Sequence, residues 1–290
     1  MATMKAIKKR ISSVNNTKKI MKAMNLVATS NLQKAKTRLE HVRPLTEDLK
    51  GIMDNVKAGM ETDDEIAFCE EREVKSIAYI ILTSDRGLCG GFNANVSKES
   101  LALIESNSGK EESIIAVGKK GLEYFSRRGK NIVHKCPAPS LVTTSGDAED
   151  LGQRATNMFL SGEVDEVYLV YTRFRTVLSH DPCIVRLLPF KADDVDKKAD
   201  TAGFNTLMSF DPDPATFMEN AIPMYLNLTI FGAMVESAVC EYASRMTSMD
   251  SATRNATEII ENLTLEYNRV RQSKITQELI EIVTGANAVK

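Results

Sequence analysis

The stretch "VESAVCEYASRMTSMDSATRNATEIIENLTLEYNRV", residues 235–270, repeats apolar or small residues in alternating steps of four and three. These steps are typical of a coiled-coil seam, because they keep one face of a helix turned toward a partner helix. The stripe consists of Val235, Val239, Tyr242, Met246, Met249, Thr253, Ala256, Ile260, Leu263, Tyr267 and Val270, and then shifts by one residue to Ile275, Leu279 and Ile282. The stretch therefore predicts a long C-terminal helix that pairs along one face.

A second seam lies near the start of the chain, where residues 4 to about 57 read as one helix. Its members are Ile7, Ile11, Val14, Met21, Ala28, Leu32, Ala35, Leu39 and Val42, with the polar Lys18 and Asn25 in the two remaining places. Pairing the two seams with each other buries both and predicts an antiparallel intramolecular coiled coil. The longer helix then keeps an unpaired end, and its apolar stretch near 275–283 needs another partner.

Prolines and a glycine predict where these helices bend, begin and end. Pro44 is expected to kink or break the first helix, and Pro223 to split a short leading helix from the last one. Asp213 before Pro214 is a favourable helix start, and Gly285 is placed to end the helix.

Between the two helices, short β-rich runs such as "VKSIAYIILTS" alternate with helical segments such as "KKGLEYFSRRG". This alternation predicts a Rossmann-like α/β domain with a largely parallel sheet. The fold class is thus α/β plus coiled coil, with the α/β domain inserted between two long helices. The expected parts are a coiled-coil helix at 1–60, the α/β domain at 74–190, a connecting loop at 191–212 and a second coiled-coil helix at 213–286.

The loop "TSDRGLCGGFNANV", residues 83–96, follows an apolar strand and precedes a helix, which is the order found in phosphate-binding sites. It lacks the Lys-Ser/Thr pair of a P-loop and the spacing of the dinucleotide fingerprint. We therefore expect a structural turn that docks the α/β domain on the helices, and nucleotide binding remains the alternative. The turn residues are Asp85, Arg86, Gly87, Gly90 and Gly91, with Asn93 completing the network.

Residues suited to catalysis or metal binding are scattered. The five cysteines form no CxxC pair, which fits a reducing compartment, and His41, His134 and His180 have no ligand at metal-binding spacing. No Gly-x-Ser-x-Gly elbow is present. We therefore predict no catalytic residue, no cofactor and no metal.

Positive charge is concentrated in the first 43 residues, although the formal net charge of the chain is −2. The basic residues there are Lys5, Lys8, Lys9, Arg10, Lys18, Lys19, Lys22, Lys34, Lys36, Arg38 and Arg43, against the single acid Glu40. This bias suggests an acidic partner, and a merely solvated face is the alternative. Nucleic acid is disfavoured because no aromatic residue for base stacking lies in this segment. A transit peptide is disfavoured because the segment continues into the helical pattern.

Near the C-terminus, the run "RVRQSKITQELIEIVTGA", residues 269–286, places Arg271, Gln272, Lys274 and Thr276 within the seam. Spacing alone leaves open whether these side chains bond to another chain or are solvated.

Three motifs in this order resemble the gamma subunit of rotary F-type ATP synthases, over nearly the whole length. They are "RISSVNNTKKIMKAMNLVATSNLQKA", "TSDRGLCGGFNANV" and "YNRVRQSKITQELIEIVTGA". The region before Asp211 is short and lacks the cysteine pair of chloroplast-type relatives, and no transit-like extension precedes the first motif, so the resemblance is to the bacterial type.

The resemblance implies a non-catalytic rotor shaft that couples ion flow through the membrane c-ring to ATP synthesis or hydrolysis on an alpha/beta hexamer. Implied partners are the alpha, beta and epsilon subunits and the c-ring, with one copy per complex, no nucleic acid and no direct bilayer insertion. The implied location is peripheral, on the cytoplasmic face of the bacterial membrane. Matching residues imply beta-subunit contacts at Met24, Arg245, Arg271, Gln272 and Thr276, and foot or c-ring contacts at Phe204, Asn205 and Phe210.

Overall fold

The computed structural model describes residues 4–58, 66–70, 72–190 and 214–288. The predicted connecting loop and the foot residues Phe204, Asn205 and Phe210 lie outside the described residues. The chain divides into two compact units, one of Met1–Thr29 with Arg245–Lys290 and one of Ser30–Ser244. Each unit is described by itself below.

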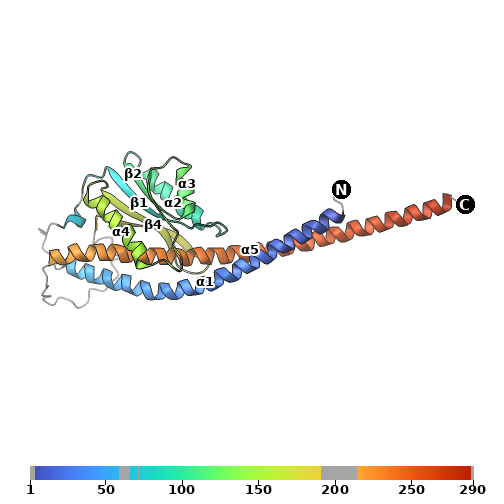
Figure 1. Cartoon of the computed structure of the whole chain (residues 1–290), viewed down its shortest axis with the longest axis horizontal. Helices are drawn as coiled ribbons and strands as arrows, with labels where there is room; N and C mark the ends of the chain where they lie inside the picture. The colour runs from blue at the N-terminus through green and yellow to red at the C-terminus, as the bar shows by residue number, and fades with distance from the viewer. Residues whose placement is uncertain (1–3, 59–65, 71, 191–213, 289–290) are drawn as a thin grey trace. The chain divides into compact units, whose positions relative to one another are not determined.

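Two long helices, α1 (Met4–Ala58) and α5 (Pro214–Ala288), contribute to both units and run in opposite directions (Figure 1). Pro44 does not break α1, and the predicted split at Pro223 was wrong, since each proline lies inside a continuous helix. A proline removes one backbone hydrogen bond, and buried residues on both sides of Pro44, Val42 and Met53, hold the helix in place by packing. Gly285 also stays inside α5, which ends at Ala288.

The predicted seams lie on the packed faces of both helices. On α1, Ile7, Ala28, Leu32, Ala35, Leu39 and Val42 are buried and the remaining seam residues, Lys18 and Asn25 among them, are half-buried. On α5, every seam residue from Val235 to Val270 is buried or half-buried. The predicted pairing of the two long helices is confirmed.

The second unit contains a five-stranded sheet in the order β3-β2-β1-β4-β5. All neighbouring strands are parallel except β5, which is antiparallel to β4. The strands are β1 (Ser76–Leu82), β2 (Glu111–Val117), β3 (Ile132–Cys136), β4 (Glu166–Phe174) and β5 (His180–Leu188). The shorter helices are η1 (Ala67–Cys69), α2 (Phe92–Ser106), α3 (Lys119–Ser126) and α4 (Ser145–Leu160). The predicted inserted α/β domain is confirmed.

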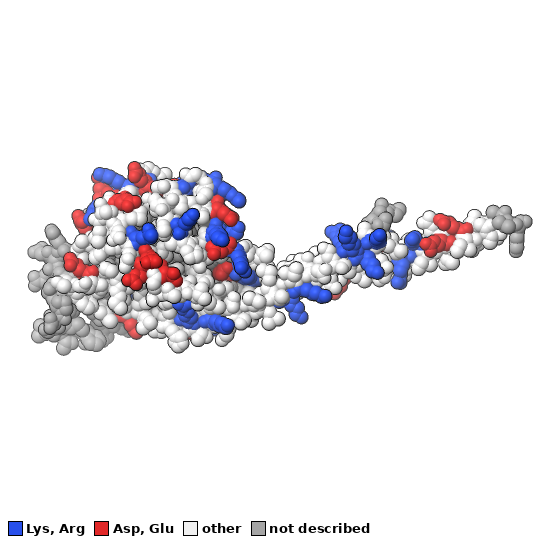
Figure 2. All heavy atoms as spheres, viewed as in Figure 1, with Lys and Arg blue, Asp and Glu red and all other residues white. Residues whose placement is uncertain are grey.

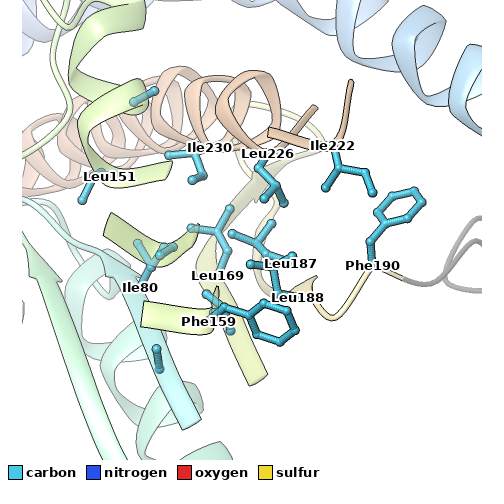
Figure 3. Close-up of a cluster of buried hydrophobic side chains, with 14 of the residues drawn as sticks. Ile80, Leu151, Phe159, Leu169, Leu187, Leu188, Phe190, Ile222, Leu226 and Ile230 are labelled. Atoms are coloured by element: carbon cyan, nitrogen blue, oxygen red, sulfur yellow. The ribbon is translucent and has the colours of Figure 1, made fainter. Parts of the chain in front are cut away.

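Strand β1 is buried on both faces, which explains its uninterrupted apolar sequence. Ile77, Tyr79 and Ile81 point to the face covered by α2 and α3. The alternate residues of β1 point to the other face, where α4 and α5 form the covering layer. Figure 3 shows Leu226 and Ile230 of α5 close to the core residues of this face. The C-terminal helix is therefore part of the α/β core as well as the partner of α1.

One 18-residue window of α5 is apolar enough to span a membrane by length and composition alone. Within that window 56% of the residues are buried against the rest of the chain. Packing in the core thus accounts for much of its apolar character.

Candidate functional site

The glycine-rich loop lies where an open parallel sheet usually binds ligands. Strand order reverses beside β1, with β2 on one side and β4 on the other. The crevice at the carboxyl ends of two such strands is the usual nucleotide site in doubly wound folds. Residues 83–91 connect β1 to α2 at this point.

Polar side chains in and beside the loop are bonded within the domain. The Asn93 Oδ1 accepts from the Ser84 N–H at 2.9 Å, and its Nδ2 donates to the Ser84 Oγ at 2.8 Å. The Asp85 Oδ1 accepts from the Lys119 N–H at 2.9 Å, at the start of α3. Leu88 and Gly90 have positive φ angles of 64° and 57°, a conformation that makes the chain turn sharply. These bonds support the predicted turn.

Helix α5 fills the place beside this loop. Cys89 and Phe92 form a buried cluster with Cys240 of α5, and Phe174 at the end of β4 packs against it. Burial raises the pKa of the Cys240 thiol, which keeps its proton and lies 3.4 Å from the Thr172 carbonyl oxygen. The structural-turn interpretation remains a prediction, and this packing supports it over nucleotide binding.

A pocket of about 290 Å³ lies elsewhere, beside the start of β2 and the end of α2. Tyr79, Glu112 and Lys130 are among its lining residues, and burial raises the pKa of Tyr79 to about 12. No residue of the glycine-rich loop lines it. Among the described residues, no group of three or more His, Cys, Asp or Glu side chains is placed to hold a metal ion.

In the unit of Met1–Thr29 with Arg245–Lys290, two residues named from the resemblance lie at one level of the helical pair. The Asn25 Nδ2 donates to the Met246 carbonyl oxygen at 2.8 Å, which sets the register of α1 against α5. Met24 and Arg245 each precede a member of this pair by one residue, and both are half-buried. Sequence alone did not reveal this juxtaposition.

The other three residues, Arg271, Gln272 and Thr276, lie on an exposed end of α5. Every residue from Arg271 to Asn287 is exposed. Large apolar side chains there are exposed as well: Ile275, Leu279, Ile280, Ile282 and Val283. Lys274 forms an ion pair along its own helix, with its Nζ 3.6 Å from a Glu278 carboxylate oxygen. This end presents an amphipathic surface without a counterpart in the described chain.

Figure 2 shows Lys and Arg side chains gathered on the helical pair near the N-terminal end of α1. Lys5, Lys8, Lys9, Lys19 and Lys22 are all exposed. Their ammonium groups are available to an acidic partner.

Comparison with known proteins decides the family. A family model described as "ATP synthase" matches residues 3–289. The ATP synthase gamma chain of Alkaliphilus metalliredigens is 39% identical over 295 residues, covering 99% of both chains. That of Desulforamulus reducens is 38% identical over 290 residues and covers all of both chains. The chain belongs to the ATP synthase gamma chain family.

Solved structures with the same fold come from more distant relatives. A chain of the Euglena gracilis mitochondrial ATP synthase, in a structure described as OSCP/F1/c-ring, gives a TM-score of 0.68 at 17% identity and covers 99% of this chain and 94% of that one. A chain from the Tetrahymena thermophila structure described as central stalk/c-ring gives a TM-score of 0.59 at 23% identity, covering 80% and 99% respectively. At these identities the likeness shows the fold.

Family membership confirms the predicted identity as a gamma chain, a non-catalytic subunit of the membrane-associated ATP synthase. The structure adds three residues: Arg43 of α1 pairs with Glu236 of α5, Glu236 accepts from the Phe174 N–H of β4, and Ser244 lies beside His180 of β5. The sequence marks Arg43 only as one of the basic residues near the N-terminus. The signal for the other two was their spacing, since positions 236, 240 and 244 are four residues apart and share one face of a helix.

Proposed function

We propose that the chain is the rotating shaft of a bacterial F-type ATP synthase, coupling ion flow through the c-ring to ATP synthesis or hydrolysis on an alpha/beta hexamer. The observation that carries this proposal is the end of α5, residues 271–287, where apolar and polar side chains are all exposed. A contiguous exposed apolar surface on a helix indicates a binding surface. In a gamma chain, a sleeve formed by the hexamer would cover it.

The contacts with the beta subunits would lie at two levels of the shaft. Met24 and Arg245 would meet the moving acidic loops, and Arg271, Gln272 and Thr276 would supply polar contacts nearer the tip. The exposed lysines of α1 support this assignment, because acidic loops passing a basic helix are electrostatically complementary.

The other partners follow from the same family role. Epsilon and the c-ring would bind at the foot, where Phe204, Asn205 and Phe210 are the proposed contacts. One copy would serve each complex, held peripherally on the cytoplasmic face of the bacterial membrane without inserting in the bilayer.

The first test is assembly. The chain is produced with its alpha and beta subunits, the complex is isolated, and ATP hydrolysis is assayed. We expect one copy per three beta subunits, and loss of activity when residues 271–290 and the first helix are both removed. The proposal would be refuted if the chain purifies alone and ATP hydrolysis by the hexamer is the same with and without it.

A truncation after Val270 separates folding from assembly. It removes only residues that are exposed or outside the described chain, and it keeps the whole buried seam. The isolated truncated chain should therefore melt like the full chain, while its complex with the hexamer is weaker. Equal affinity of both chains for the hexamer would show that this end is not a contact surface.

Met24→Lys tests the beta-subunit contact directly. An added charge at a half-buried position of α1 should uncouple ATP hydrolysis from ion pumping. Thr37→Lys is the matched control, because it adds the same charge at an exposed position of the same helix. Unchanged pumping per ATP hydrolysed in Met24→Lys would place Met24 away from the coupling contacts.

A further inference from the structure

Three polar residues of α5 form a row on the face that packs against the sheet. Glu236, Cys240 and Ser244 are four residues apart, so they lie above one another on the helix. All three are buried, in a segment where every residue from Ala233 to Ser244 is buried.

Each member of the row bonds to β4 or β5. The Phe174 N–H donates to the Glu236 Oε1 at 3.0 Å, and the Cys240 thiol donates to the Thr172 carbonyl oxygen at 3.4 Å. The Ser244 Oγ lies 2.6 Å from the His180 Nε2, within hydrogen-bond distance. The row therefore joins α5 to the end of β4 and to the start of β5.

Helix α1 joins the same network through Arg43. The Arg43 Nη2 donates to the Glu236 Oε1 at 2.8 Å and to the Phe174 carbonyl oxygen at 3.4 Å. Glu236 is only 8% exposed. Its carboxylate therefore depends on the Phe174 N–H and the Arg43 guanidinium for the hydrogen bonds that water would otherwise make. One buried carboxylate thus holds α1, α5 and β4 together.

The physical difference between this row and the surrounding core is directionality. Apolar contacts around α5 favour burial, but they are non-directional and do not by themselves select one bonding geometry. Hydrogen bonds lose strength steeply when their angle or length changes. A row of three, spread over two turns of the helix, fixes both the rotational setting of α5 and its position along its axis.

We propose that Glu236, Cys240 and Ser244 are positioning residues that lock α5 against turning relative to the α/β domain, so that torque passes between the domain and the shaft without slip. This inference rests on the proposed rotor function. It adds a role for residues that lie inside the chain and face none of the proposed partner contacts.

The test measures torsional stiffness in the assembled complex. The alpha/beta hexamer is immobilised and rotation is stalled, and a bead is attached through a biotin-acceptor peptide inserted after Ser108, an exposed turn residue of the α/β domain. Thermal fluctuations of the bead angle then report the stiffness between domain and shaft. We expect Glu236→Ala to widen the angular distribution by about twofold, because the Phe174 N–H and Arg43 lose their buried acceptor.

Two further variants and a control separate the effect of these hydrogen bonds from a general effect of substitution. Ser244→Ala should widen the distribution less, since it removes one hydrogen bond whereas Glu236→Ala removes two. Glu236→Gln should recover part of the stiffness, because its amide oxygen still accepts from the Phe174 N–H. Glu123→Ala is the control, because Glu123 pairs with Lys120 on α3 and touches no other element through that bond.

The outcomes are distinct. A lower melting temperature with an unchanged angular width in Glu236→Ala and Ser244→Ala would overturn the proposal and leave a structural role only. A wild-type chain that does not assemble with the hexamer would instead refute the proposed function, whatever the variants do.

Discussion

Two segments of α5 both contain apolar residues and have opposite environments. From Ala233 to Ser244 every residue is buried, and from Arg271 to Asn287 every residue is exposed. The first segment packs on the sheet on one side and on α1 on the other, whereas the second has no counterpart in the described chain. The difference teaches that one continuous helix can form part of the core in one segment and offer a binding surface in another.

The comparison is tested most strongly by truncating one isoleucine just before the buried segment and one within the exposed segment. Ile230 is fully buried and Ile282 is 67% exposed. Ile230→Ala should lower the free energy of unfolding by about 4 kcal/mol, because it leaves a cavity in the core. Ile282→Ala should change it by less than about 0.5 kcal/mol in the isolated chain. Urea unfolding of both variants checks this, and equal losses would abolish the distinction.

Close packing at the carboxyl edge of the sheet gives the next largest effect. Gly118 has φ 94°, and a Cβ there would lie 2.3 Å from the Thr83 carbonyl oxygen. Gly118→Ala should therefore cost about 3 kcal/mol of unfolding free energy, from strain and overlap together. Gly109 has φ 104° with nothing within 4 Å, so Gly109→Ala should cost only the strain, about 1 kcal/mol. Equal thermal shifts in the two variants would show that the contact with Thr83 does not matter.

The helical pair is tested through the half-buried amide of Asn25. Asn25→Ala removes the bond to the Met246 carbonyl oxygen and should cost about 1 kcal/mol. Hydrogen exchange of α1 amides near residue 25 should become faster by about fivefold for that loss. Asn15→Ala makes the same change at an exposed position and should have little effect. Equal acceleration by Asn15→Ala would exclude the hydrogen bond as the cause.

A pH effect of smaller size is expected where α5 docks on β5. Burial lowers the pKa of His180, and the Asp181 carboxylate offsets only part of the shift. Below the ordinary histidine pKa of about 6.5, the unfolded chain therefore binds more protons than the folded one. The stabilisation is complete above that pH and is lost as pH falls through the lower folded-state pKa.

Thermal melts at pH 7 and pH 5 measure this effect. The wild-type melting temperature should fall by about 2 °C more than that of His180→Gln over this interval. The same fall in both proteins would assign the pH dependence to other groups.

Much of the fold followed from periodicity. The seam positions, from Ile7 on α1 to Val270 on α5, could be named because a four–three spacing has one structural explanation. Neither Pro44 nor Pro223 interrupts its helix, because the loss of one backbone bond is small beside the packing on either side. That packing is a property of the folded chain, and local propensity does not contain it.

The candidate contact residues divide in the same way. The family resemblance of the motifs pointed to Met24, Arg245 and the polar residues near the tip. Their contacts with the beta subunits stay predictions. The amphipathic pattern of residues 271–287 also followed from spacing. That the loop after β1 packs on Cys240 could not be predicted, since the two lie about 150 residues apart in the chain and no local pattern links them.

By itself, the sequence determined the two long helices, the inserted α/β domain and the family, because periodicity and ordered motifs are local properties of the chain. Only the tertiary structure decided that α5 forms one layer of the sheet's core and that Glu236, Cys240 and Ser244 bond to β4 and β5. Hydrogen bonds and packing depend on atoms being a few ångströms apart, and long-range pairings of that kind are set only when the whole core assembles.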